Sequence, residues 1–205
     1  MLSKVETFWR SSDSVAKLFS SQTTSSISKS LIRLRLKEIL AKPDPALGYL
    51  NGKLRFWLGW AQEITGDHAA AQESWRQARS ELEPFLKEQP ENWYLIGFLA
   101  LTNMGLGDKT AALALAERAM AANPIEKDAL SGPTPIEILA RVAAQIGEPD
   151  RAIIALQKLL SIPYGGFTVV PLTPALLRLD PMFDPLRNDP RFDALVQRLA
   201  PTASH

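Results

Sequence analysis

A pattern of leucine, glycine and alanine returns with a period of roughly 40 residues, and a period of this length restricts what the chain can fold into. Three glycines, each followed by an acidic residue, recur at nearly equal spacing. An alanine lies five positions after each glycine, and a leucine followed by a small residue precedes it. The repeated positions are Leu58, Gly59, Gly66 and Ala71, then Leu99, Ala100, Gly107 and Ala112, then Leu139, Ala140, Gly147 and Ala152. Features that recur in one register predict copies of a single structural unit.

The residue types of this unit are those of two helices joined by a tight turn. Glycine just past a helix end adopts the left-handed conformation without a Cβ penalty. An acidic residue after it can cap the next helix, and small residues let the two helices approach closely. Residues 56–84 therefore predict a turn at Gly66-Asp67 and a second helix that ends before or near Pro84, because proline cannot continue a helix. Pro124 and Pro163 follow the later copies in the same way.

The rest of the chain extends this arrangement at both ends. We predict three repeats in residues 44–163, at about 44–84, 85–124 and 125–163. Residues 1–43 predict a degenerate hairpin with amphipathic segments at 2–19 and 27–41; the alternative is a flexible tail with one transient helix. Residues 164–205 predict an irregular segment followed by capping helices. Their Asp-Pro steps at Asp180, Asp184 and Asp189 can each cap and begin a helix, and a stack of repeats needs a cap to cover its open end.

The repeated hairpins resemble tetratricopeptide (TPR) repeats. The match lies at the positions given above, together with Trp75, Ala78, Ala119 and Pro124, and it covers roughly residues 52–163. The period is longer than the one usual in this family, and the usual tyrosine one turn before the glycine is replaced by Gln62, Asn103 or Ala143. The resemblance implies an all-α, right-handed superhelix of antiparallel helix pairs with a short helical C-terminal cap.

The C-terminal stretch at 176–199 resembles the ends of repeat regions in bacterial signalling proteins, namely serine/threonine kinases, adenylate cyclases and winged-helix regulators. This second resemblance implies a bacterial origin and a regulatory interaction module, and it carries over no catalytic residue.

In such repeats the first helix of each hairpin lines a concave groove, so the register predicts the residues that would contact a partner. The predicted groove residues are Phe56, Trp60, Glu63, Tyr94, Leu101, Met104, Glu137 and Arg141, with Lys53, Ile64, Gly97, Thr134 and Gln145 at further groove positions. The large aromatic side chains of Phe56 and Trp60 are natural anchors for a partner helix or extended peptide. The alternative is that both pack in the core.

Composition removes several classes of function. The chain has no cysteine and two histidines, one of them at the C-terminus, which leaves little material for metal or histidine chemistry. The glycines of residues 48–54 are not spaced as in a phosphate-binding loop, and no strand precedes them. We therefore expect no catalytic residues, no metal and no cofactor. The net charge of +1 gives no expectation of nucleic-acid binding. No apolar run approaches the length of a membrane span, and the N-terminus lacks the features of a secretory signal, so we expect a cytoplasmic protein.

These observations predict a non-enzymatic scaffold that binds a protein or peptide partner in its concave groove and that is compatible with a homo-oligomer. The alternative is a regulatory C-terminal portion, or a relative, of a bacterial signalling enzyme of the kinase or adenylate cyclase type, acting within its own chain or by dimerisation.

Overall fold

The computed structural model describes residues 26–42, 44–162 and 172–197, and all regular structure in these ranges is helical. Three helical hairpins form the centre of the molecule. They are α4 (Leu50–Glu63) with α5 (His68–Glu88), α6 (Trp93–Gly105) with α7 (Lys109–Ala122), and α8 (Pro133–Ile146) with α9 (Pro149–Leu160). Helix α3 (Ser26–Leu40) and the short 3-10 helix η1 (Pro45–Leu47) precede them, and α10 (Pro174–Leu179), η2 (Pro181–Leu186) and α11 (Pro190–Gln197) follow them.

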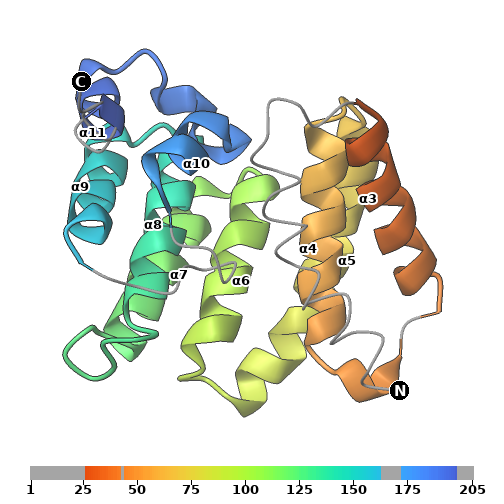
Figure 1. Cartoon of the computed structure of the whole chain (residues 1–205). Coiled ribbons are helices and arrows are strands. Elements are labelled where there is room, and N and C mark those ends of the chain that lie inside the picture. The colour runs from red at the N-terminus through yellow and green to blue at the C-terminus, as the bar shows by residue number, and fades with distance from the viewer. Residues whose placement is uncertain (1–25, 43, 163–171, 198–205) are drawn as a thin grey trace.

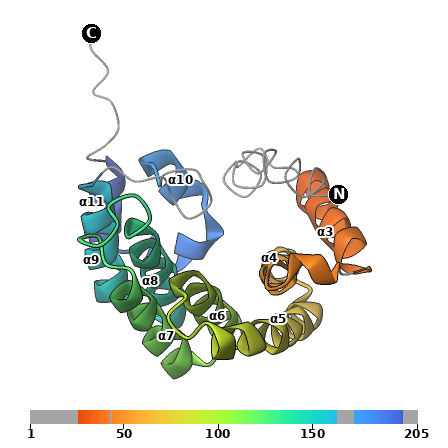
Figure 2. The ribbon, with the colours of Figure 1, turned by 90° about the horizontal axis from the view of Figure 1, so that it is seen from below.

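The hairpins stand side by side in a curved row (Figure 1). Seen along the helices, α4, α6 and α8 lie on the inner side of the curve, and α5, α7 and α9 lie on the outer side (Figure 2). Helices α4 and α6 contact each other, as do α6 and α8, so the inner helices form a continuous layer. The 3-10 helix η2 packs on α8 at one end of the row, and α3 packs on α4 at the other.

The turns within the hairpins have the predicted backbone. Gly66, Gly107 and Gly147 have φ angles of +81°, +81° and +87°, in the left-handed region that favours glycine. The capping prediction holds in full at one of the three acidic residues, because the Asp108 carboxylate accepts a hydrogen bond of 3.1 Å from the Ala111 N–H. The side chains of Asp67 and Glu148 make no such bond.

The small residues of the pattern allow the close packing that was predicted. Trp75 of α5 fills the space beside Gly59 of α4 and Gly105 of α6, where a Cβ atom on either glycine would lie 2.5 Å from the indole. The indole N–H also donates to the Phe56 carbonyl oxygen at 3.3 Å. Trp75 therefore joins the first two hairpins.

The expectation that proline closes the second helix before or near Pro84 is wrong in its reason, because α5 continues through Pro84 and ends four residues later at Glu88. Proline leaves the carbonyl four residues earlier without its helical partner, and that residue, Ser80, is exposed to water. Leu82 is fully buried, and Phe85 and Leu86 pack on the core, so apolar contacts hold the last turn in place. Pro124 does follow the end of α7, as predicted, whereas Pro163 lies outside the described residues.

At the ends of the row the predictions are met in part. Helix α3 confirms the segment predicted at 27–41, while the segment at 2–19 lies outside the described residues. Asp180 caps η2 by accepting from the Met182 N–H at 3.0 Å, and Asp189 accepts from the Arg191 N–H at 2.9 Å at the start of α11. The Asp184-Pro185 step does not begin a helix, because both residues lie inside η2.

Two hydrophobic clusters share helix α8. Ile138, Val142 and Ile146 join the cluster formed with α4, α5 and α6. The other face of α8 joins a second cluster with α9, η2 and α11, which buries residues Ala140, Ala143, Leu156, Phe183, Leu186, Phe192 and Val196. The C-terminal segment is therefore packed into the fold as a cap on the third hairpin.

Candidate partner-binding face

The predicted groove residues lie on the inner helices, but most of them are buried. Phe56, Leu101 and Glu137 have 0% of their surface exposed, and Trp60, Met104 and Arg141 are also buried. Glu63 and Tyr94 are partly exposed. The register gives the helix on which each residue lies, whereas the depth of each side chain follows from the packing of neighbouring helices.

Phe56 and Trp60 lie in the core and not in an open groove, which were the two alternatives for these residues. The Phe56 ring makes edge contacts with Trp57 and Phe98, with ring centroids 5.1 and 6.0 Å apart. Trp60 belongs to the same buried cluster. The expectation that these two aromatics stand open in a groove is wrong, because inner helices in contact with one another bury the side chains between them.

The prediction that Leu101 and Met104 line an open groove is wrong for the same reason. All residues of α6 from Leu95 to Met104 are buried, and a helix that is apolar all round is expected to be buried.

Glu137 and Arg141 hold a segment of the chain itself. The Arg141 guanidinium donates to the Glu137 carboxylate at 2.8 and 3.0 Å and to the Asp180 carboxylate at 2.5 Å. It also lies 3.3 Å from the Met182 sulfur, with its central carbon 5.1 Å from the centre of the Phe183 ring. Asp180, Met182 and Phe183 come from the cap, so this ion cluster fastens the cap to the inner face of α8.

The charge of Arg141 is well compensated despite its burial. Burial acts to lower the pKa of Arg141, but the negative charges of Asp180 and Glu137 outweigh it and raise the pKa above its ordinary value. Gln145, one turn further along α8, donates to the Met182 carbonyl oxygen at 2.9 Å. The inner face of α8 thus binds both side chains and backbone of the segment that contains Asp180 and the start of η2.

A second cluster joins α4 to α6 near the start of both helices. The Lys53 ammonium donates a hydrogen bond to the Tyr94 hydroxyl. It lies 5.1 Å from the centre of the Tyr94 ring and 5.3 Å from that of Phe98, within the range of cation–π interactions. Tyr49 makes an edge contact with Tyr94 at 6.1 Å. Tyr49, Lys53 and Tyr94 are partly exposed, so this cluster is accessible to a partner.

Burial changes the proton affinity of both polar groups in this cluster. It lowers the pKa of Lys53 from 10.5 to about 8, because aromatic surroundings solvate an ammonium less well than water does. It raises the pKa of the Tyr94 hydroxyl, and the neighbouring Tyr49 adds to this effect. Near neutral pH the tyrosine therefore stays protonated, while the lysine is close to its titration range.

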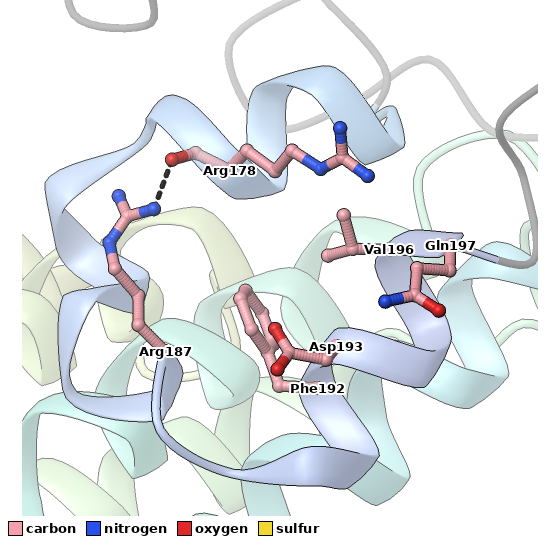
Figure 3. A pocket seen from close by; sticks show the side chains of 6 residues that line it. All are labelled: Arg178, Arg187, Phe192, Asp193, Val196 and Gln197. Atoms are coloured by element: carbon pink, nitrogen blue, oxygen red, sulfur yellow. Dashed lines mark hydrogen bonds between the residues drawn. The ribbon is translucent and has the colours of Figure 1, made fainter.

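A shallow hollow of about 280 Å³ lies between α10, η2 and α11 (Figure 3). Its lining residues are Arg178, Arg187, Phe192, Asp193, Val196 and Gln197. The Arg187 guanidinium donates to the Arg178 carbonyl oxygen and pairs with Asp184 at 2.6 Å. Because both charge signs are present and Arg187 is already paired, the hollow has no clear preference for a charged ligand.

Within the described ranges, no group of three or more acidic, histidine or cysteine side chains could hold a metal ion. His68 pairs with Glu63 at 2.9 Å on the surface. Gly52 and Lys53 lie within helix α4, so residues 48–54 do not form a phosphate-binding loop. None of the helices in the part of the chain that the structure describes is long and apolar enough to cross a membrane.

Comparison of the chain with models of protein families, with curated proteins and with solved structures gave no match.

Two contacts of this face were not predicted from the sequence: that of Lys53 with Tyr94, and that of Arg141 and Gln145 with the cap. Lys53 and Tyr94 occupy equivalent positions of successive repeats, 41 residues apart, and this spacing indicates that they are neighbours on adjacent inner helices. The role of Asp180 and Met182 could not be found in this way, because the cap lies outside the repeat and has no register with α8.

Proposed function

We propose that this protein is a non-enzymatic interaction scaffold of the tetratricopeptide type, which binds a protein or peptide partner on its inner face. Support comes from the three hairpins in a curved row, and from the glycine turns and close glycine contacts at the repeated positions. This architecture presents side chains from successive repeats on one continuous surface.

One observation carries the proposal: the inner face of α8 already holds another segment of the chain, the 3-10 helix η2 with its capping residue Asp180. Arg141 binds the carboxylate of Asp180 and contacts Met182, while Gln145 binds the Met182 carbonyl oxygen. The same layer can therefore supply the hydrogen bonds and apolar contacts by which repeat proteins hold a peptide.

The partner would bind at the part of the layer that the described cap does not cover. Tyr49, Lys53 and Tyr94 are partly exposed there. Lys53 belongs to α4 and Tyr94 to the adjacent α6, and Tyr49 is the residue just before α4. Aromatic side chains with a polar end are effective in interfaces, because they combine apolar area with hydrogen bonding.

Affinity capture from an extract of the source organism tests this proposal. The bait is the full chain, compared with the Tyr94→Ala variant and with Lys158→Glu as control, because Lys158 is exposed on α9 of the outer layer. We expect proteins retained by the wild type and by Lys158→Glu to be lost with Tyr94→Ala, and the binding of each identified protein to be reproduced with purified material. Equal retention by all three baits would contradict a partner site at this end of the inner face.

A further inference from the structure

We draw no further inference here: the strongest candidate, the surface patch of partly exposed aromatic side chains that Tyr49, Phe85, Trp93 and Tyr94 form where α4 and α6 begin and α5 ends, carries no proposal, because nothing in the structure shows what covers it.

Discussion

The guanidinium of Arg141 and the carboxylate of Asp180, which are 39 residues apart in the chain, lie 2.5 Å apart and bind the cap to the third hairpin. Glu137 shares the same guanidinium and is completely buried. Removal of the arginine would leave the Glu137 carboxylate in the interior without the guanidinium that it binds.

Arg141→Met should therefore destabilise the protein strongly. Breaking a buried ion pair by removing one partner costs about 3–5 kcal/mol, and the loss is measured as the free energy of unfolding in urea. The double variant Arg141→Met/Glu137→Met should recover much of this loss, because the buried carboxylate is removed together with the arginine. Arg151→Ala is the control: Arg151 pairs with Glu117 on the surface, and such a pair contributes only about 0–1 kcal/mol. A single variant as stable as the control would show that the cluster adds little.

Gly59 and Gly97 both lie on inner helices, and alanine substitution of each compares a close contact with a rigid ring to one with a flexible side chain. A Cβ on Gly59 would lie 2.5 Å from the rigid indole of Trp75, whereas one on Gly97 would meet the terminal methyl group of Ile138. Gly59→Ala should lose about 1–3 kcal/mol through overpacking, more than the gain in helix propensity of about 1 kcal/mol. Gly97→Ala should be close to neutral, because the isoleucine can rotate. Equal effects in urea unfolding would contradict this distinction.

Phe56→Ala should destabilise the fold rather than act only on binding. The ring is completely buried against Trp57 and Phe98, and loss of such a phenylalanine costs about 3–5 kcal/mol. Thermal unfolding followed by circular dichroism provides the measurement, with Leu34→Ala as control, because Leu34 is 59% exposed on α3. A stable Phe56→Ala variant would support the groove position of this residue.

The depressed pKa of Lys53 predicts a dependence of stability on pH. The folded-state pKa is about 8 and the unfolded value is about 10.4, so between these values the unfolded chain binds a proton that the folded chain does not. Stability linked to Lys53 must therefore rise as the pH increases from about 8 towards 10. The gain is on the order of 1–3 kcal/mol at most.

Urea unfolding at about pH 7 and pH 9.5 measures this gain as a difference between the wild type and Lys53→Met. The variant should lose the increase, whereas Lys158→Met should keep it. The comparison with the variant cancels the ionisation of ordinary tyrosines, whose pKa is about 10, because both proteins contain them.

Features that depend on neighbouring residues in the sequence were predictable, whereas features that depend on contacts between distant residues were not. The glycine turns were predictable, because a left-handed φ angle just past a helix end selects glycine at a fixed place in each repeat. Whether Pro84 ends a helix depends on two things the local sequence does not contain: the exposure of Ser80, and the core contacts of the residues that follow Pro84.

The candidate site was less predictable than the fold. The repeat register gives the helix and the face on which a residue lies, but the burial of Phe56 and Leu101 depends on how closely neighbouring inner helices pack. The pairing of Arg141 with Asp180 is a long-range contact between a repeat and a segment outside it. The sequence pattern contains no signal for such a pairing.

The division of α8 between two hydrophobic clusters makes the two ends of the row unequal. Repeat arrays often lose structure from a terminal unit, because each unit contacts only its neighbours. Here, loss of the cap would expose one apolar face of α8 and break the ion cluster of Glu137, Arg141 and Asp180 in the same step. The cap therefore opposes stepwise fraying from its end, and amide protons of α8 and α9 should exchange together with those of η2 and α11 as one cooperative unit.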